Sequence, residues 1–381
     1  MSPTILPPLK KGGHATHCKR CLSGLPSSQV DLDPTKMALS FYCLGFLDLS
    51  GELEAKSKDW EREHWRDWIW TQQTREPIMA SNMHAVIRQT EHIPLGGHYG
   101  TGFRPSSYMT ATEYATEEYS DHNTPHIIMT YTALLSLSIL RDDFSRLDRK
   151  GLLKFLRSCQ NSDGSFSSEP LGGDSDLRTT FSAFSISSML DDWSGMDVSS
   201  ALRFISSCRT YEGGYGQSPS GEALGGTTYC ALASLQLSKQ LESLSTQDRQ
   251  KTVRWLVQNQ ASNGGFRGRT NKDADACYCF WCGASLHVLD AGDLVDEAAM
   301  SSFIASCQFK YGGIAKTPGE HPDPYHTYLS LAAVALLPPN PSGEASWEIC
   351  PLDPLLNATH QTSSWARAHI PAPKVDGDHA L

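Results

Sequence analysis

The sequence has little that would place the chain in a membrane or on a nucleic acid. No apolar run approaches the roughly 18 residues of a membrane span, and the N-terminal stretch MSPTILPPLKKGG lacks the apolar core of a signal peptide. Positive charge is in deficit, because 42 Asp and Glu residues outnumber 32 Lys and Arg residues and leave a formal net charge of −10. That balance argues against a nucleic-acid partner. It indicates either simple solubility or attraction for a basic peptide or partner subunit.

Signs of a disulfide-stabilised exported protein are also lacking. The chain carries eleven cysteines, an odd number, without an export signal, so we expect reduced thiols and a cytoplasmic protein. Cys18 and Cys21 form a C-x-x-C pair with no second pair to complete a metal site, and we interpret the pair as incidental. At 381 residues the chain is long enough to bury a large core in one domain or two.

What the sequence does contain is an internal repeat of about 50 residues. A Gln or Cys, a small turn, and a Gly followed by an aromatic or aliphatic residue recur in SCQNSDGSF, SCRTYEGGYG, NQASNGGF and SCQFKYGGI. Their Phe166, Tyr215, Phe266 and Ile314 lie 49, 51 and 48 residues apart, and a looser copy, GGHYGTGF, ends at Phe103. The glycines suit helix C-caps and turns with positive φ.

Each turn separates two helical patterns of different character. An amphipathic stretch such as KTVRWLVQNQ precedes it, and a more apolar stretch such as CYCFWCGASLHVL follows after a polar loop. This alternation predicts an all-α fold with an outer and an inner ring of helices, closed as an α/α barrel or toroid. The repeat period alone is equally consistent with an open solenoid. Phe280, Trp281 and Tyr328 on the apolar stretches favour closure, because such side chains could line a central cavity.

The flanks of the chain fall outside the repeat. Both are rich in Pro and Ser, so we expect an N-terminal extension over residues 1–35 and a barrel domain over 36–338. A C-terminal tail over 339–381 is expected to wrap the barrel or to be partly disordered.

Asp275, Cys277 and His326 are candidate metal ligands of types O, S and N. Cys277 and His326 lie 49 residues apart, one repeat, so they should meet on one rim of a circular fold. The mixed donor set suits Zn²⁺, and three protein ligands leave a fourth position open, as in catalytic sites. Each residue also has an ordinary structural interpretation: Cys277 as core, Asp275 as a helix N-cap, and the histidine as a cap or surface residue. Cys279 and Cys282 share the helix and are interpreted as core.

A basic loop precedes the candidate ligands. Arg269 and Lys272, with Tyr278, could bind a diphosphate and stabilise negative charge developing on a leaving group. Without the metal ligands, a solvated basic loop would be the default interpretation. Trp281 lies one turn beyond Cys277 and could line an apolar slot, although most tryptophans at such spacing are core. A zinc-activated thiol, a diphosphate site and an apolar cavity together indicate alkylation of a thiol by an isoprenoid diphosphate.

At these residues the chain resembles the beta subunits of protein prenyltransferases. Among them it is most similar to type I geranylgeranyltransferases of a fungal kind. The resemblance covers roughly residues 30–365 and rests on the motifs HIIMTYTALLSLSILRDDFSRL, WSGMD, GRTNKDADACYCFW, HPDPYHTY and CPLDPLLNATHQTSS.

The resemblance implies an enzyme and assigns roles to its residues. Asp275, Cys277 and His326 match the family's zinc ligands, and one zinc ion is expected for each beta subunit. The residues that match diphosphate contacts are Arg269, Lys272 and Tyr278. Trp281 matches an aromatic residue of the isoprenoid pocket, and Arg178 matches an arginine near the carboxylate of the peptide substrate. The family works as a heterodimer with a helical alpha subunit. It prenylates proteins that end in Cys-a-a-X, here with X mostly Leu or Phe and including Rho-type small GTPases.

Four positions depart from, or vary within, the family pattern. Leu224 stands where an E-x-H-G-G segment usually has a diphosphate-binding His, and Tyr325 resembles the farnesyltransferase pattern. Lys316 stands where farnesyltransferases have an Asp linked to Mg²⁺, which implies catalysis without Mg²⁺ unless Lys316 is simply a surface residue. Ala38 stands where a Trp closes the farnesyltransferase pocket, which implies room for geranylgeranyl diphosphate. Alternatively, Ala38 is ordinary helix packing and the floor is set elsewhere, with Tyr325 a candidate.

Other functions remain open from the sequence. The nearest alternative is a farnesyltransferase beta subunit, followed by a Rab-type geranylgeranyltransferase beta subunit. Terpene cyclases share barrels of this kind, but the chain lacks their D-x-D-D motif, and Asp174-x-Asp176 is too short. A non-catalytic helical-repeat scaffold would have no reason to keep three metal ligands across two repeats.

Overall fold

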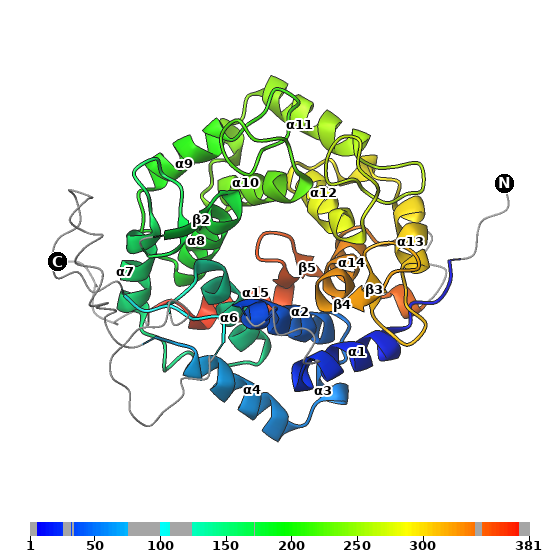
Figure 1. The fold of residues 1–381 in the computed structure, drawn as a ribbon, viewed down its shortest axis with the longest axis horizontal. Helices are drawn as coiled ribbons and strands as arrows, with labels where there is room; N and C mark the ends of the chain where they lie inside the picture. The colour runs from blue at the N-terminus through cyan, green and yellow to red at the C-terminus, as the bar shows by residue number, and fades with distance from the viewer. Residues whose placement is uncertain are drawn as a thin grey trace, which may run out of the picture.

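Six inner helices form a closed ring in the computed structural model, which describes residues 6–25, 32, 34–74, 100–106, 124–170, 172–339 and 345–372. Each inner helix contacts the next, and the last contacts the first, so the ring has no open end (Figure 1). The ring consists of α2 (Lys36–Leu49), α6 (Ile127–Ile139), α8 (Leu177–Leu190), α10 (Gly225–Leu237), α12 (Ala276–Val288) and α14 (Pro324–Leu336). The predicted α/α barrel is therefore confirmed, and the open solenoid is excluded.

A second ring of helices surrounds the first (Figure 1). It consists of α1 (Lys11–Ser23), α4 (Asp59–Thr71), α7 (Arg149–Cys159), α9 (Val198–Ser207), α11 (Thr246–Gln258) and α13 (Glu297–Ser306). Outside the two rings, the described ranges also contain the short helices α3 (Leu53–Lys56), η2 (Leu241–Ser243), η3 (Gly292–Leu294) and η4 (Ala345–Trp347), and a C-terminal helix, α15 (His360–His369). The outer helix α7 buries one face through Leu152, Phe155 and Leu156, whereas nearly every residue of α6 is buried. This difference follows the amphipathic and apolar patterns in the sequence.

The repeated turn has the same structure in each copy. Isolated β-bridges pair Gln160 with Phe166, Arg209 with Tyr215, Gln260 with Phe266 and Gln308 with Ile314. Gly264 in one of these turns has φ 89°, and a Cβ added there would lie 2.1 Å from the carbonyl oxygen of Ala299. Glycine is required at this position both by the positive φ and by the close approach of the next outer helix. The looser copy GGHYGTGF lies partly outside the described residues, but Phe103 forms the corresponding bridge with Gln73.

The N-terminal ends of the inner helices meet at one mouth of the ring. Side chains cap several of them: Asp176 accepts from Arg178 N, Asp275 from Cys277 N, and Asp323 from His326 N. Two short hairpins, β1 (Ser167–Glu169) with β2 (Gly172–Ser175) and β3 (Ile314–Ala315) with β4 (Pro322–Asp323), lead into α8 and α14. The mouth therefore gathers polar side chains above an apolar interior.

The C-terminal segment closes the opposite side of the ring. A hairpin of β5 (Leu352–Asp353) and β6 (Ala358–Thr359) leads into α15 (His360–His369), and the region around β5 lies inside the ring in Figure 1. Three inner-helix tyrosines donate hydrogen bonds to carbonyl oxygens of its loop. The pairs are Tyr131 with Leu356 (2.8 Å), Tyr229 with Pro354 (2.7 Å) and Tyr328 with Asn357. We call residues 352–359 the plug hairpin.

Both flanks of the predicted barrel domain pack against it. Helix α1 contacts α2 and α14, and α15 contacts α6 and α8. The division into 1–35, 36–338 and 339–381 stays a prediction, and residues 1–5, 26–31, 340–344 and 373–381 lie outside the described ranges. No helix in the part of the chain that the structure describes is long and apolar enough to cross a membrane.

The buried His14 should make stability depend on pH. It lies on α1 with Nε2 2.9 Å from Gln308 Oε1, and burial lowers its pKa from 6.5 to about 4. As pH falls from 6.5 toward 4, His14 becomes protonated in the unfolded chain but stays neutral in the folded chain. The part of the free energy of unfolding that the neutral buried histidine allows above pH 6.5 is therefore lost. At about 1.36 kcal/mol per pKa unit, the full loss is about 3 kcal/mol. Chemical denaturation should show that the free energy of unfolding falls between pH 7 and pH 5 by about 2 kcal/mol more in the wild type than in His14→Gln. An equal fall in the two proteins would contradict this role of His14.

Candidate active site

A cavity of about 350 Å³ lies inside the ring. Its wall is rich in aromatic rings, which come from Phe41, Tyr42, Tyr131, Phe181, Tyr229, Tyr278, Trp281 and Tyr325. Its mouth is formed by the N-terminal ends of inner helices, where Arg178, Gln217 and Leu224 line it. Its closed end includes Asn357 of the plug hairpin. The cavity is thus an apolar slot with a polar mouth, a shape suited to a ligand with a hydrocarbon body and a charged head.

Asp275, Cys277 and His326 come together beside this cavity, next to its lining residues Tyr278 and Tyr325. Their donor atoms all lie within 4.8 Å of one another, and His326 Nε2 is 3.3 Å from Asp275 Oδ1. Asp275 precedes α12 and caps it, Cys277 lies in the first turn of α12, and His326 lies in the first turn of α14. Neighbouring inner helices contact each other along the ring, so a one-repeat separation in sequence becomes direct proximity in space.

The electrostatics of the three groups fit a divalent cation. Burial raises the pKa of the Cys277 thiol well above its usual value, and the Asp275 carboxylate raises it further. Burial alone would raise the pKa of Asp275, but hydrogen bonds from His326 and Cys277 outweigh it and hold that pKa below its usual value. Burial would lower the pKa of His326, yet Asp275 and Asp323 raise it to about 9. Without a metal, the raised pKa values of Cys277 and His326 favour protonated forms of both groups. Zinc would replace these protons when the O, S and N donors bind it.

Asp323 is a functional candidate that the sequence analysis missed. Its Oδ2 lies 2.6 Å from His326 Nδ1, while its Oδ1 accepts from the His326 backbone N–H at 2.9 Å. This carboxylate fixes the imidazole with Nε2 directed toward Asp275 and Cys277, an arrangement typical of metal-binding histidines. The signal was present in the sequence as an Asp three residues before the histidine, in the position of an N-cap.

Replacing Asp323 with Asn should weaken metal binding without removing a ligand. Loss of the carboxylate partner of the histidine typically costs about 10–100-fold in metal affinity. Competition with a zinc chelator should therefore show a drop of that size for Asp323→Asn. The exposed Asp273, two residues before Asp275, provides a matched control, and Asp273→Asn should change zinc affinity by less than about threefold. Equal affinities of the Asp323 variant and the wild type would show that this carboxylate serves only as a helix cap.

Tyr325 connects the candidate metal site to the cavity wall. Its hydroxyl accepts a hydrogen bond from Trp281 Nε1 at 2.9 Å, and its proximity to the Cys277 thiol contributes to the pKa shifts of both groups. Its ring packs edge-on against Tyr42 at 5.2 Å and against His326 at 5.0 Å. The aromatic wall and the donor set are therefore parts of one packed unit.

Three cationic side chains predicted for the site lie on loops near the start of α12 or α10, and none of them is among the described residues that line the cavity. Arg269 Nη1 pairs with Glu222 Oε2 at 2.6 Å, and Lys272 is exposed on the same loop. Lys316 is also exposed, and its carbonyl oxygen accepts from Ala276 N at 2.9 Å, so its backbone lies at the start of α12. The pairing of Arg269 with Glu222 was not expected from the sequence.

Tyr278 lies directly under the basic loop. A Cβ added at Gly268 would approach the Tyr278 ring to 2.1 Å, so the loop rests on this ring only because Gly268 has no side chain. Burial, followed by the nearby Cys277 and Asp275, raises the pKa of Tyr278 to about 12. The phenol is therefore protonated at neutral pH and can donate a hydrogen bond into the mouth.

Arg178 lies on the other side of the cavity mouth. Its Nη2 is 2.6 Å from Asp176 Oδ2, and the same carboxylate oxygen accepts from Gln217 Nε2 at 2.7 Å. The Arg178 side chain is 48% exposed, so part of the guanidinium remains available to a ligand. Arg178 therefore lies at the start of α8, on a different inner helix from the candidate metal ligands of α12 and α14. This position fits a contact with a different part of a substrate.

The remaining predicted positions differ in how they meet the cavity. Leu224 and Trp281 both line it, and Leu224, at the start of α10, offers no side-chain donor. Ala38 is 8% exposed on α2 and is not among the described residues that line the cavity. Phe41 and Tyr42, three and four positions later on α2, do line it, which places Ala38 on the same face one turn toward the helix start.

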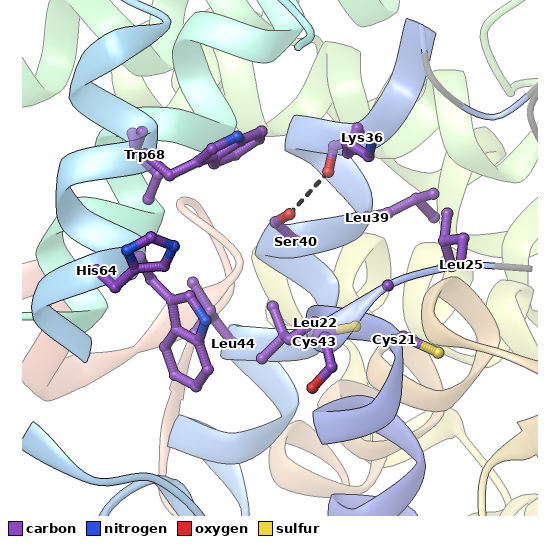
Figure 2. A pocket seen from close by; sticks show the side chains of 14 residues that line it. Cys21, Leu22, Leu25, Lys36, Leu39, Ser40, Cys43, Leu44, His64 and Trp68 are labelled. Carbon is purple, nitrogen blue, oxygen red and sulfur yellow. Dashed lines mark hydrogen bonds between the residues drawn. The ribbon is translucent and has the colours of Figure 1, made fainter. Parts of the chain in front are cut away.

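A second cavity, of about 370 Å³, lies outside the inner ring between α1, α2 and α4. Figure 2 shows Cys21, Cys43 and Trp68 among its lining residues. None of the predicted site residues lines it, so we assign it no part in the candidate active site.

Comparisons with known proteins agree with this architecture. The family described as "Prenyltransferase alpha-alpha toroid domain" matches residues 9–358. The chain is 41% identical over 321 residues to the geranylgeranyl transferase type-1 subunit beta of Dictyostelium discoideum, covering 83% of this chain and 88% of that relative. It is 43% identical over 237 residues to the Arabidopsis thaliana subunit of the same name, covering 60% and 63%.

A solved structure shows the same fold. Candida albicans protein geranylgeranyltransferase-I complexed with GGPP superposes with a TM-score of 0.78 at 25% identity, covering 96% of this chain and 100% of that chain. The closer similarity to fungal enzymes, which the sequence motifs suggest, stays a prediction. The chain belongs to the prenyltransferase alpha-alpha toroid family and, within it, to the beta subunits of type I geranylgeranyl transferases.

Proposed function

We propose that this chain is the catalytic beta subunit of a zinc-dependent heterodimer that transfers a geranylgeranyl group to the Cys of C-terminal Cys-a-a-X sequences. X is mostly Leu or Phe, and Rho-type small GTPases are the expected protein substrates. The observation that carries the proposal is the O, S and N donor set within 4.8 Å beside an aromatic-lined cavity. The donor is taken to be geranylgeranyl diphosphate, which the solved relative binds under the name GGPP.

The reaction forms a thioether and releases diphosphate. The substrate thiol loses its proton, its sulfur bonds to C1 of the isoprenoid, and the C1–oxygen bond breaks with its electron pair leaving on the diphosphate. Zinc, held by Asp275, Cys277 and His326, would supply Lewis acidity that favours the thiolate form of the substrate cysteine. Asp323 orients the His326 ring, and Tyr325, next to His326 in sequence, forms part of the cavity wall.

Cationic and phenolic groups would stabilise the leaving diphosphate. Tyr278, protonated at neutral pH, can donate a hydrogen bond, and Arg269 and Lys272 provide positive charge on the adjacent loop. Because Arg269 pairs with Glu222, diphosphate binding requires that this ion pair open or that the guanidinium serve both partners. Leu224 cannot contribute, so these groups and Lys316 would take over the role of the family's usual histidine.

The hydrocarbon and the peptide would occupy different parts of the cavity. The aromatic wall, including Trp281, suits the isoprenoid, and the partly exposed Arg178 suits the C-terminal carboxylate of the peptide. The relatives are named as beta subunits, which supports an alpha subunit as the obligatory partner. All eleven thiols are free, which supports activity in the reducing environment of the cytoplasm.

Co-expression with a candidate alpha subunit tests the proposal. The complex should transfer labelled geranylgeranyl to a Cys-a-a-Leu peptide in preference to labelled farnesyl to a Cys-a-a-Ser peptide. The opposite preference would favour the farnesyltransferase alternative. Two observations support testing it: Tyr325 resembles the farnesyltransferase pattern, and the chain is 35% identical over 230 residues to the Schizosaccharomyces pombe farnesyltransferase beta subunit. A complex with neither transfer nor bound metal would favour a non-catalytic scaffold.

Catalysis should not require Mg²⁺. A lysine ammonium at position 316, beside the start of α12, can neutralise diphosphate charge without a second metal. Turnover should change by less than about twofold when free Mg²⁺ is removed, whereas Lys316→Asp should lose about tenfold and recover part of that loss with added Mg²⁺. The nearby exposed Lys310 provides a control, and Lys310→Asp should not acquire Mg²⁺ dependence. A wild-type rate that falls more than tenfold without Mg²⁺ would contradict the prediction.

A further inference from the structure

One position of the repeat lies over the start of the preceding inner helix. It comes two residues after the aromatic or aliphatic residue of the turn, and we call it the rim position. In three repeats its carbonyl oxygen accepts a hydrogen bond from the first N–H of that inner helix: Gln217 from Leu177 (3.1 Å), Gly268 from Gly225 (2.8 Å) and Lys316 from Ala276 (2.9 Å). The backbone thus fixes each rim residue at the N-terminal end of an inner helix, where the mouth of the ring lies.

The side chains at the rim position differ from repeat to repeat. Gly268 belongs to the basic loop and has no side chain, and Lys316 carries an exposed positive charge. Gln217 is neutral and exposed, and of these three residues it alone lines the central cavity. Its side chain is therefore the rim group best placed to act on what enters the cavity at α8.

Gln217 holds a carboxylate of the neighbouring repeat. Its Nε2 donates to Asp176 Oδ2 at 2.7 Å, and the same oxygen accepts from Arg178 Nη2 at 2.6 Å. The other oxygen, Asp176 Oδ1, accepts from the backbone N–H of Arg178 at 2.7 Å. The Asp176 side chain is only 4% exposed, so these bonds replace the water that would otherwise solvate the carboxylate. A carboxylate paired with a guanidinium accepts hydrogen bonds and does not donate them, which fixes the amide of Gln217 with its NH₂ group toward Asp176.

The orientation of Asp176 determines the orientation of Arg178. The guanidinium contacts Asp176 through Nε at 3.0 Å and Nη2 at 2.6 Å, a two-point contact that sets the plane of the group. The Arg178 side chain nevertheless remains 48% exposed and lines the cavity. Gln217, Asp176 and Arg178 therefore form one unit that joins two repeats and keeps a guanidinium accessible at the mouth.

We propose that Gln217 is a positioning residue for the peptide substrate. By holding Asp176 from the next repeat, it fixes the Arg178 guanidinium in the orientation that binds the C-terminal carboxylate of the Cys-a-a-X sequence. The inference rests on the proposed function, which assigns that carboxylate to Arg178. Gln217 then determines how strongly the enzyme prefers a free C-terminus to a blocked one.

Peptide binding to the co-expressed complex, loaded with a non-transferable analogue of geranylgeranyl diphosphate, tests the inference. One probe is a Cys-a-a-Leu peptide with a free carboxylate, and the other is the same peptide as its C-terminal amide. The wild type should bind the acid at least about tenfold more tightly than the amide, because only the acid pairs with the guanidinium. Gln217→Met keeps the length of the side chain but removes the donor, and it should reduce this ratio at least about fivefold through weaker binding of the acid.

Further variants show whether Gln217 acts through Arg178. Gln217→Glu places a second carboxylate against Asp176 and should reduce the acid-to-amide ratio at least as much as Gln217→Met. Arg178→Ala should bring the two peptides to within about threefold of each other, and Gln217→Met added to it should change the ratio by less than about twofold. The exposed Gln258, at the end of the outer helix α11, provides a matched control, and Gln258→Met should leave the ratio unchanged.

Three results would overturn the inference. They are a wild-type ratio in both Gln217 variants, an equal loss of acid and amide binding in Gln217→Met, and a full effect of Gln217→Met in the absence of Arg178. A complex that transfers normally but keeps its ratio in Arg178→Ala would overturn both the inference and the assignment of the carboxylate to Arg178. A complex that neither binds the peptides nor transfers the isoprenoid would overturn the proposed function itself.

Discussion

Replacing Cys277 with alanine should remove bound zinc and reduce prenyl transfer by about a thousandfold. A metal contributes several kcal/mol to a reaction of this kind, and about 1.36 kcal/mol corresponds to a tenfold change in rate. Cys277 is one of only three donors within reach in the described residues, and its thiol lies close to Asp275 and Tyr325 beside the cavity. Zinc content by atomic absorption and transfer of labelled geranylgeranyl to a Cys-a-a-Leu peptide measure the two effects together.

The same helix provides the control for this substitution. Cys279 is fully buried on α12, two positions away, and is not among the donor atoms of the cluster. Cys279→Ala should keep a full equivalent of zinc and lose only some stability, about 1 kcal/mol, from the small cavity it leaves. A Cys277→Ala enzyme with normal turnover, or a Cys279→Ala enzyme that loses zinc, would show that the ligand assignment is wrong.

Replacing Ala38 with Trp should reverse the choice of donor. The extra five carbons of a geranylgeranyl chain bury apolar surface worth up to about 4 kcal/mol, at about 0.8 kcal/mol per CH₂. An indole on the face of α2 that carries Phe41 and Tyr42 would fill the space that those carbons need. The ratio of geranylgeranyl to farnesyl transfer should then fall by at least about tenfold, and by as much as about a thousandfold if the whole burial term is lost.

Size alone should produce this effect. Ala38→Ser keeps the small volume and should leave the donor ratio within about twofold of the wild type. Because Ala38 itself is not among the residues lining the cavity, this experiment also tests whether the slot extends toward the start of α2 when a donor is bound. An unchanged donor ratio in a folded, zinc-loaded Ala38→Trp enzyme would place the length limit elsewhere, with Tyr325 the first candidate.

The repeat explains which parts of the site could be predicted from the sequence. Equivalent positions of adjacent repeats lie on adjacent inner helices, so the 49-residue separation of Cys277 and His326 translated directly into contact at one rim. Of Phe280, Trp281 and Tyr328, which the sequence suggested for the cavity wall, only Trp281 is among the described residues that line the cavity, whereas Phe280 and Tyr328 are buried in the packing around it. Periodicity of this kind carries spatial information without any knowledge of loops.

Features outside the repeat were not predictable in this way. Asp323 occupies the same N-cap position in its repeat as Asp275, nine residues after Ile314, so the repeat indicates its role as a cap but not the contact of its carboxylate with the His326 ring. The pairing of Arg269 with Glu222 joins two loops 47 residues apart that have no pattern in common. The plug hairpin lacks the repeat signature altogether, so its three tyrosine partners could not be inferred from the tail sequence.

The most direct test of the account is a crystal structure of the co-expressed complex, recorded with X-rays on both sides of the zinc absorption edge. The account predicts one anomalous peak per beta chain, about 2.0–2.3 Å from Asp275 Oδ, Cys277 Sγ and His326 Nε2, beside the aromatic-lined cavity. An active complex with no anomalous peak at these three residues, or with its zinc bound elsewhere, would contradict it.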